Sequence, residues 1–279
     1  MPELPEVEVV RRGLQTQVVG ATIARVTDVH PRAVLGMTGR QLGAQVRGAR
    51  FEAIGRHGKY LLCHLSNGRT IIAHLRMSGK FRVIGAADSP VPYTRARLHL
   101  ADGRSLCYAD VRTLGNMRVV ATDQLAGDPS LGILGIDALD PDFTSGYLRE
   151  RVRASRRQLK VFLLDQSNFA GVGNIYASEI CFLVGISPFR RTNRLTRAET
   201  ERLHRAIVDE LTAAVEHGGT TFDVNSPHLY LDANGQPGRH ADCLRVYQRH
   251  GLPCRSCGDT IRRKVQQQRG TFYCPKCQR

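Results

Sequence analysis

The sequence opens with the residues MPELPE, which combine an amine with two carboxylates. If Met1 is removed, Pro2 presents a secondary amine that can attack a carbonyl-like carbon and form a cationic iminium. Glu3 and Glu6 lie one helical turn apart and share a face, where a carboxylate could transfer the protons of such a reaction. The same residues also make an ordinary helix start, with proline at the first position and acids in the first turn. The amino terminus alone leaves both interpretations open.

Four of the eight cysteines form two close pairs, Cys254-x-x-Cys257 and Cys274-x-x-Cys277. Four thiolates at this spacing can converge tetrahedrally on one Zn²⁺, and they leave no open position for catalysis. The spacing therefore predicts one structural zinc ion, with a basic β-hairpin at 260–273 between the pairs. A disulfide framework is the alternative, which the lack of a secretion signal disfavours.

Three shorter motifs place polar or flexible side chains at the ends of expected strands. Lys59 follows a glycine that would let a backbone pass close to a ligand, although a surface lysine is the simpler interpretation. The motif HLRMSG contains His74 and Met77, and a methionine by itself is more often part of a core. In DVRTLG, Arg112 and Leu114 alternate with their neighbours and so point to one face.

The composition predicts a polyanionic partner. The 279 residues carry 40 Lys and Arg against 25 Asp and Glu, which gives a net charge of +15 and a pI near 10.0. Nucleic acid is the commonest partner of so basic a chain. With 42% hydrophobic residues the chain can bury real cores, and no apolar run is long enough to span a membrane. The scattered remaining cysteines indicate a reducing cytoplasm.

A reactive terminus needs a rigid support, and the sequence predicts one. Residues 7–18 repeat apolar side chains at helical spacing, which predicts a helix whose apolar stripe packs on the next part of the chain. From 21 to about 120 the sequence changes to short β-branched runs, with the hairpin signals NG at 67–68 and DG at 102–103. Sequential strands without helices between them predict an antiparallel sandwich or barrel.

The second half of the sequence is helical. A segment rich in glycine and proline, 126–146, predicts a linker. Beyond it the apolar period predicts helices over 148–166 and 174–183. A third helix is predicted from the capping box of Thr196 and Glu199 to the glycines at 218–219. The turn GVG at 171–173 is similar to a phosphate cradle, but a lone Gly-x-Gly is a weak signal.

Taken together, the motifs resemble those of bacterial formamidopyrimidine-DNA glycosylases, the MutM/Fpg family, over the whole sequence. The shared motifs are MPELPEVE at 1–8, GKY at 58–60, HLRMSG at 74–79, DVR at 110–112, GNIYASE at 173–179, QRGTFYC at 268–274 and the two Cys-x-x-Cys pairs. The resemblance implies an α+β fold: an N-terminal helix on an antiparallel β-sandwich, then a helix-two-turn-helix domain with a C-terminal zinc-finger hairpin. It assigns 1–125 to the catalytic sandwich, 126–146 to the linker, 147–241 to the helix-two-turn-helix domain and 242–279 to the zinc finger.

The resemblance also implies a bifunctional enzyme of base-excision repair. It would remove oxidised purines such as 8-oxoguanine and formamidopyrimidines from double-stranded DNA, and then cleave the abasic site by β,δ-elimination. It would work as a monomer in the bacterial cytoplasm, at the nucleoid, with one structural Zn²⁺ and no membrane partner. Residues 220–240 would form the loop that closes over the base once it is flipped out of the duplex.

Residue by residue, five positions match the family's catalytic set. Pro2 is similar to the nucleophile, Glu3 to the proton shuttle and Glu6 to an acid that supports the site. Lys59 and Arg269 are similar to residues that bind the phosphates flanking the damaged nucleotide.

Five further positions match residues that contact DNA. Asn174 is similar to another phosphate-binding residue, and His74 lies beside the same backbone. Met77, Arg112 and Leu114 are similar to the wedge that fills the gap left by the flipped base. Leu114 departs from the family's usual phenylalanine, so wedging would persist while aromatic stacking is lost.

Two other functions stay open. An endonuclease VIII-like enzyme would act on oxidised pyrimidines, but that group tends to carry glycine in place of Leu4. A zinc-bearing nucleic-acid-binding protein would have no catalytic activity at all. The sequence also departs from the family at Ser178, at 238–240, where GRH replaces a common GYF, and at Gln248, which replaces a glycine.

Overall fold

The computed structural model of the protein describes residues 2–222 and 230–279. Met1 lies outside the described residues, and so does 223–229, which falls within the loop predicted at 220–240.

The described residues divide into two compact units. Unit 1 comprises Met1–Gly132 and His217–Ala241, and unit 2 comprises Ile133–Glu216 and Asp242–Arg279. The second half of the sequence therefore returns to the first unit for one segment. This segment packs on the first helix, where the side chains of Gln17 and Asn234 are hydrogen-bonded at 2.8 Å. The four-part division into domains stays a prediction.

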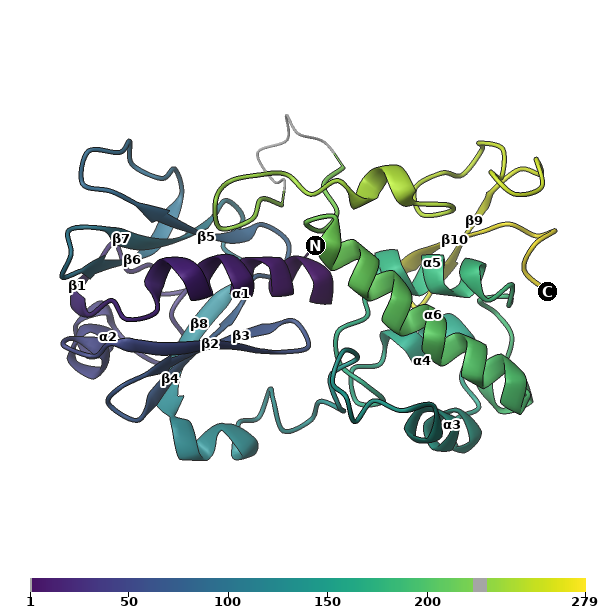
Figure 1. The fold of residues 1–279 in the computed structure, drawn as a ribbon, viewed down its shortest axis with the longest axis horizontal. Coiled ribbons are helices and arrows are strands. Elements are labelled where there is room, and N and C mark those ends of the chain that lie inside the picture. Colours follow the sequence, from purple (N-terminus) through teal and green to yellow (C-terminus); the bar gives the residue numbers. More distant parts are fainter. Residues whose placement is uncertain (1, 223–229) are drawn as a thin grey trace. The chain divides into compact units, whose positions relative to one another are not determined.

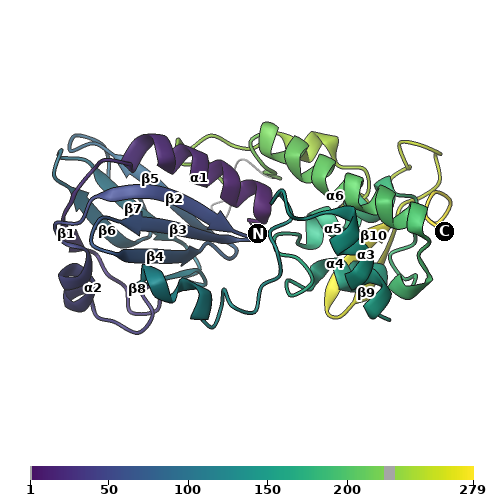
Figure 2. The ribbon, with the colours of Figure 1, turned by 60° about the horizontal axis from the view of Figure 1, so that its bottom comes forward.

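Unit 1 contains two antiparallel four-stranded sheets, in agreement with the predicted sandwich (Figure 2). The sheets have the orders β1-β6-β7-β5 and β2-β3-β4-β8. The strands are β1 Ile23–Thr27, β2 Phe51–His57, β3 Tyr60–Leu65, β4 Arg69–His74, β5 Gly79–Ile84, β6 Thr94–Leu100, β7 Ser105–Asp110 and β8 Asn116–Ala121. The turns predicted at 67–68 and 102–103 join β3 to β4 and β6 to β7, so both hairpin predictions are confirmed.

The first helix, α1 (Leu4–Val18), confirms the helix predicted at 7–18 and lies along the strands of unit 1 (Figure 1). Its buried apolar stripe includes Val7, Val10, Leu14 and Val18. Polar contacts fix it to β2 as well, because the Ile54 N–H donates to the Gln15 side chain at 2.9 Å. Together these contacts hold the amino terminus against a rigid sheet.

The short helix α2 (Gly39–Val46) has no counterpart among the predicted elements. Its two glycines lower its helix propensity, which hides it in the sequence. It begins at a reciprocal capping box, in which Thr38 and Gln41 each satisfy the backbone N–H of the other. A short 3₁₀ helix, η1 (Thr122–Gly127), follows β8.

Unit 2 is largely helical. Its helices are α3 Ser145–Ala154, α4 Leu159–Leu164, α5 Asn174–Leu183, η2 Thr192–Arg194 and α6 Arg197–Glu216, and η3 His240–Cys243 follows in the chain. The prediction of one helix over 148–166 is wrong, because the chain breaks between α3 and α4. At the break, the Thr192 hydroxyl donates to the carbonyl oxygens of Ser155 (2.7 Å) and Arg157 (3.2 Å). This distant contact replaces the helical hydrogen bonds that the sequence pattern suggests.

The hairpin predicted between the cysteine pairs is confirmed. Strands β9 (Arg262–Gln266) and β10 (Arg269–Tyr273) pair in antiparallel register through a two-residue turn. Both turn residues, Gln267 and Gln268, have positive φ angles of 45° and 62°. Such a turn matches the twist of the strands but is normally made by glycine or asparagine.

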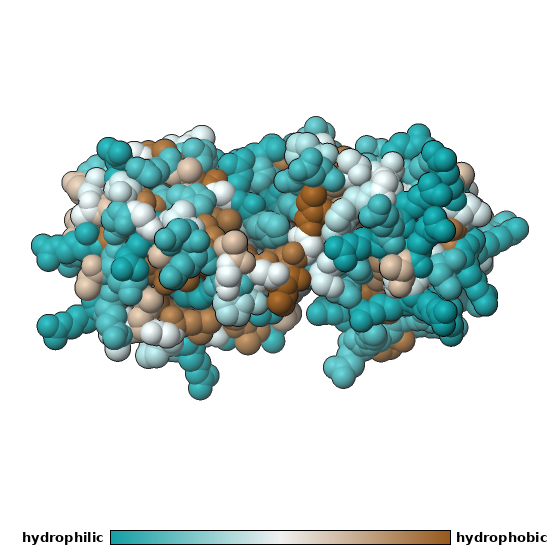
Figure 3. All heavy atoms as spheres, turned by 90° about the horizontal axis from the view of Figure 1, so that it is seen from below, coloured by the Kyte–Doolittle hydropathy of each residue, from teal (hydrophilic) through white to brown (hydrophobic). Residues whose placement is uncertain are grey.

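Hydrophilic residues cover most of the molecular face seen in Figure 3, and hydrophobic residues gather there in small patches. Among the residues that the structure describes, no helix has both the length and the apolar character needed to cross a membrane.

Candidate active site

The candidate catalytic residues Pro2 and Glu3 lie at the start of α1. Pro2 and Glu3 are both buried, Glu3 with 1% of its surface exposed. Glu3 adopts an extended conformation as the residue that caps α1, and its backbone N–H donates to Glu6 Oε2 at 2.7 Å. Pro2, the candidate nucleophile, and Glu3, the candidate proton shuttle, are therefore both held at the start of α1.

The Glu6 side chain connects the start of α1 to the segment that contains Gly219 and Thr220. Its second oxygen, Oε1, accepts from the Thr220 N–H at 2.8 Å. Gly219 has a φ angle of +84°, and a Cβ added there would lie 3.0 Å from Glu6 Cγ, so only glycine fits this approach. Tyr230 donates its hydroxyl to the Glu6 carbonyl oxygen at 3.2 Å. With backbone N–H groups on both carboxylate oxygens, Glu6 is better suited to position the terminus than to transfer protons.

Glu8 links α1 to the hairpin that carries Lys59. Arg56, on β2, donates to Glu8 Oε2 at 3.0 Å and to the Gly58 carbonyl oxygen at 3.0 Å. Gly58 has a φ angle of +55°, and Lys59 follows it with 9% of its surface exposed. The sequence contains no sign that this lysine is buried. Glu8 and Arg56 thus set the position of Lys59 relative to the helix that carries Pro2.

This link predicts a pH-dependent stability. Burial raises the pKa of Glu8, but hydrogen bonds from Arg11, Arg12 and Arg56 outweigh it and lower the pKa from 4.5 to about 2. A lowered carboxyl pKa stabilises the fold above pH 4.5, and this contribution is lost as the pH falls through about 2. We expect Glu8→Gln to lower the free energy of unfolding by about 1–2 kcal/mol at pH 7, because partial exposure weakens such ion pairs.

Chemical denaturation of both proteins between pH 7 and pH 3 measures this effect. The difference in the free energy of unfolding should shrink steadily below pH 4.5. Glu52→Gln is the control, since the side chain of Glu52 forms an exposed pair with Arg50 at 3.8 Å. A difference that stays constant over the whole range would contradict the assignment.

His74 lies at the end of β4, opposite Tyr60 of β3, with the two rings edge-on at 4.6 Å between centroids. Burial lowers the pKa of His74 to about 3, with further contributions from Arg76 and Lys59. Its Nδ1 accepts from the Arg76 N–H at 3.0 Å, so the proton of the neutral ring is on Nε2. His74 can therefore offer one neutral donor to a ligand at physiological pH.

A fully buried aspartate connects the two loops that carry the predicted wedge. Asp110 Oδ1 accepts from the Ser78 hydroxyl at 2.5 Å and from the Arg112 N–H at 3.1 Å. Its Oδ2 accepts from the Gly115 N–H at 2.7 Å. Asp110 therefore fixes the loop after β4 and the loop after β7 to each other. The sequence shows that Asp110 precedes Arg112 and Leu114, but it does not show that Asp110 is buried or which groups it binds.

The wedge residues themselves project from these loops. Met77 and Leu114 are 44% and 45% exposed, unusual values for large apolar side chains. Arg112 is exposed and its Nη1 lies 3.4 Å from the Met77 sulfur. The structure thus brings Met77 and Arg112 together, and Leu114 follows Arg112 by two residues. Asp110 fixes the loops that carry these apolar and cationic side chains.

In unit 2 a second group of predicted residues meets the β9–β10 hairpin. Asn174, the first residue of α5, donates its side-chain N–H to the Gly270 carbonyl oxygen at 3.1 Å. Lys160 donates to the same oxygen at 2.6 Å and to the Thr271 hydroxyl at 3.0 Å. Lys160 was not predicted, and it is fully buried. Its only signal in the sequence is a lysine within an otherwise apolar helical run.

Arg269 follows the strained turn of the hairpin and is exposed. With Gln267 and Arg157 it lines an open, mostly polar pocket of about 530 Å³. The carbonyl oxygen of the next residue, Gly270, is the one held by Asn174 and Lys160. Helix α5 and the buried lysine therefore fix the backbone from which Arg269 extends.

The four predicted zinc ligands come together at the base of this hairpin. The sulfur atoms of Cys254 and Cys277 lie 3.9 Å apart, those of Cys257 and Cys274 3.5 Å apart, and all four lie within 4.8 Å of one another. This spacing fits a tetrahedral ion with Zn–S distances of about 2.3 Å. The fourfold thiolate set leaves the ion no open position, so its role is structural.

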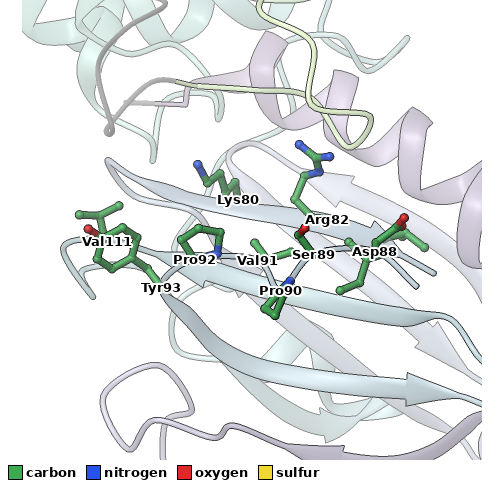
Figure 4. A pocket seen from close by; sticks show the side chains of 11 residues that line it. Lys80, Arg82, Asp88, Ser89, Pro90, Val91, Pro92, Tyr93 and Val111 are labelled. Carbon is green, nitrogen blue, oxygen red and sulfur yellow. The ribbon is translucent and has the colours of Figure 1, made fainter. Parts of the chain in front are cut away.

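A separate cavity of about 600 Å³ lies in unit 1 beside β5. Lys80 and Arg82 extend from the strand on one side, and Pro92 and Tyr93 lie on the neighbouring segment (Figure 4). None of the predicted site residues lines this cavity, so it contributes nothing to the site described above.

One departure from the family pattern has a structural consequence. Gln248 stands in the sequence where the family has a glycine, and its φ angle is +58°. A side chain is strained in this region, which favours glycine. The strained residue lies in the backbone ahead of the zinc-binding segment.

Three stretches of the chain match known families. Residues 1–117 match the formamidopyrimidine-DNA glycosylase N-terminal domain, 134–226 the formamidopyrimidine-DNA glycosylase H2TH domain, and 251–279 the zinc finger found in FPG and IleRS. Formamidopyrimidine-DNA glycosylase of Symbiobacterium thermophilum is 44% identical over 100% of this chain and 89% of its own length. That of Pelotomaculum thermopropionicum is 39% identical, over 100% and 99%.

Solved structures of MutM/Fpg proteins are also similar to this chain. MutM (Fpg) from Thermus thermophilus has a TM-score of 0.88 and 40% identity, over 99% of this chain and 98% of its own. Lactococcus lactis Fpg in a complex with DNA that contains an abasic site has a TM-score of 0.90 and 34% identity, over 100% of both chains. The relatives thus span the whole length of the chain.

Proposed function

We infer the detailed function from the fact that the chain belongs to the formamidopyrimidine-DNA glycosylase family. It is a DNA glycosylase and abasic-site lyase of base-excision repair, it acts on damaged DNA, and it carries one structural Zn²⁺. We propose that its substrates are oxidised purines in duplex DNA, 8-oxoguanine and formamidopyrimidines among them. We also propose that it acts as a monomer on chromosomal DNA in the bacterial cytoplasm.

The observation that carries the mechanism is the buried, braced amino terminus. We propose that the Pro2 nitrogen attacks the sugar C1′ carbon, so that a C–N bond forms while the bond from C1′ to the base breaks. The electron pair leaves with the base, which takes up a proton. Glu3, one residue away, moves the protons at the sugar, and Glu6 holds the terminus through its bonds to Glu3 and Thr220.

The nitrogen then loses its proton and the sugar ring opens: the C1′–O4′ bond breaks, O4′ takes up a proton, and a C=N⁺ iminium forms at C1′. This iminium acidifies the adjacent sugar carbon, C2′. Loss of a proton from C2′ then expels the phosphate on the 3′ side, and a second elimination expels the phosphate on the 5′ side. We assign Lys59, Asn174 and Arg269 to these phosphates, with His74 as a neutral donor nearby. Lys160 is a positioning residue, because it reaches the backbone beside Arg269.

The choice of substrate is tested with matched duplexes that each contain one lesion. We expect excision of 8-oxoguanine or a formamidopyrimidine opposite cytosine to be at least about 10-fold faster than excision of an oxidised pyrimidine, a difference of about 1.4 kcal/mol. The opposite order would favour the endonuclease VIII-like alternative. Binding without excision of any lesion would favour a protein that only binds nucleic acid.

The wedge gives a second test. A flipped base costs a few kcal/mol of stacking and pairing, which inserted side chains partly offset. We expect Arg112→Ala to slow excision from an intact duplex about 10- to 100-fold. Cleavage at a pre-formed abasic site should change less than about 3-fold, because that site needs no flipping of a paired base. Equal losses on both substrates would mean that Arg112 only stabilises the fold.

Arg50→Ala is the matched control for this experiment. Arg50 is exposed, and its side chain forms a weak surface pair with Glu52 at 3.8 Å. Its removal tests for a general loss of positive charge, and both activities should stay within about 2-fold of the wild type.

A further inference from the structure

The cavity of about 600 Å³ beside β5, within unit 1, has the size of a small-molecule site, since such sites span about 300–1,000 Å³. Strand β5 forms one wall, and the segment 88–93 forms the other (Figure 4). Every second residue of β5 faces the core, and Lys80 and Arg82 lie between these on the outer face of the sheet. Their partners on β7 are the small residues Ala109 and Cys107, which leave space above this face.

Lys80 and Arg82 give the cavity an unbalanced positive charge. Burial lowers the pKa of Lys80, and the nearby charge of Arg82 lowers it further. The Nε of Arg82 is buried and has no hydrogen-bond partner among the described residues. Of the described residues that line the cavity, Asp88 alone carries a carboxylate, and its Oδ2 accepts from the Gly85 N–H at 2.7 Å. An anion between the two cations would relieve their mutual repulsion.

Tyr93 places an exposed aromatic ring at the rim of the cavity. It is 54% exposed, and its φ angle of 60° lies in the left-handed region that bulky residues rarely adopt. A strained backbone at an exposed aromatic residue costs stability, and such strain is common at ligand-binding sites. Pro92 adds a second flat apolar surface beside this ring (Figure 4). A nucleobase of any kind can stack on such a ring, because every base has a π-face.

The cavity adjoins the loop that carries the predicted wedge. Val111, which lines the cavity, directly precedes Arg112. The Asp110 N–H donates to the Tyr93 carbonyl oxygen at 3.1 Å, and Arg95 Nε donates to the Asp110 carbonyl oxygen at 2.9 Å. The rim of the cavity and the base of this loop therefore share backbone contacts. Since the chain acts on DNA, a nucleotide is the phosphate-bearing ring compound that would meet this surface.

We propose that this cavity binds one nucleotide, with its phosphate between Lys80 and Arg82 and its base against Tyr93. Arginine and lysine both bind phosphate groups through charge-assisted hydrogen bonds. A free mononucleotide and a nucleotide of a bound DNA strand offer the same chemical groups, and experiment separates these two sources. The cavity contains none of the proposed catalytic residues, and the proposal does not depend on their roles.

Binding of dGMP to the full-length protein, with its zinc finger loaded, is measured by calorimetry. We expect a dissociation constant below about 1 mM. Lys80→Ala and Arg82→Ala should each weaken binding at least about 10-fold, because each removes a charged donor to the phosphate. Arg25→Ala is the control, since Arg25 is exposed on β1 at the opposite edge of the same sheet, and it should leave binding unchanged.

The role of the ring is tested separately. Tyr93→Ala should weaken dGMP binding about 10-fold, because the base then loses its stacking partner. Tyr93→Phe keeps the ring and should bind dGMP within about 2-fold of the wild type. Inorganic phosphate and deoxyguanosine each carry one half of the ligand, and each should bind at least about 10-fold more weakly than dGMP.

Saturation with a duplex that contains a stable abasic-site analogue separates the two sources. If the cavity takes a free nucleotide, dGMP should bind the saturated complex as tightly as it binds the free protein. If it takes a nucleotide of the bound strand, the duplex should exclude dGMP, and Lys80→Ala should weaken duplex binding more than Arg25→Ala does.

The proposal is wrong if the wild type does not bind dGMP. It is also wrong if the Lys80 and Tyr93 variants bind dGMP as the wild type does, because the nucleotide then binds elsewhere on the protein. Binding of inorganic phosphate as tight as that of dGMP would contradict it as well, since the base would then make no contact with the protein.

Discussion

A protein that retains Met1, or whose Pro2 nitrogen is acetylated, should yield no borohydride-trapped complex with lesion DNA. Base excision should fall at least about 1,000-fold, or about 4 kcal/mol in transition-state stabilisation. The reason is the amine itself. An α-amine has a reference pKa near 8, against about 10.4 for a lysine side chain, so far more of it is unprotonated at neutral pH.

The variant Pro2→Gly separates the need for a free amine from the need for proline. It keeps an α-amine at the same position, so it should still form a trapped complex, although more slowly. A two-residue extension before Pro2 removes the amine and should behave like the acetylated protein. Glu3→Gln should stall base excision while the amine remains, because the protons at the sugar then lack a carrier.

Lys59 is the rival nucleophile. It is buried, with 9% of its surface exposed, a feature that the sequence did not reveal. Peptide mapping of the trapped complex decides between the two amines. DNA attached to the peptide that contains Lys59 would show that the role assigned to Pro2 is wrong.

The sequence predicts most of the supporting fold because local signals and the final structure agree. Helix α1, the two hairpins with glycine turns and the cysteine hairpin each depend on neighbours in the chain, and each was found. The break between α3 and α4 was missed, because it depends on the Thr192 hydroxyl, far away in the sequence. Helix α2 was missed because glycines weaken its pattern.

The same distinction holds for the candidate site. Residue types and spacing pointed to Pro2, Glu3 and the cysteines, whose chemistry is visible in the chain itself. The parts that position them were not predictable, since their partners come from distant segments. Glu6 braces Thr220, Asp110 joins two loops, and Lys160 reaches the hairpin only in the folded chain.

The second large effect concerns the zinc finger. We expect Cys257→Ser to lose the structural zinc, and we expect the β9–β10 hairpin to unfold with it. The hairpin contributes to a small apolar cluster that contains Val246, Ile261 and Phe272 and also Phe182 of α5. Units of this size depend on their metal for stability, because the free energy of metal binding is also their free energy of folding.

In the folded hairpin, Asn174 and Lys160 donate to the Gly270 carbonyl oxygen and so fix the backbone from which Arg269 extends. When the hairpin unfolds, Arg269 loses this fixed position. Phosphate contacts carry no sequence information, so affinity should fall for all duplexes alike, by about 10- to 100-fold, and its dependence on salt should weaken. Lesion-containing and undamaged DNA should be affected in the same proportion. Cys181→Ala, at a buried cysteine of α5 outside the four-cysteine group, controls for the loss of a thiol.

Zinc content and DNA affinity must be measured on the same preparations. If Cys257→Ser keeps one zinc per chain and binds DNA as the wild type does, the finger neither needs all four thiolates nor supports Arg269. If zinc is lost while affinity is kept, the metal stabilises the hairpin but the hairpin does not contact phosphates. Only the joint loss of zinc and affinity agrees with a metal-stabilised hairpin that presents Arg269 to the DNA backbone, because in that case both effects share one structural cause.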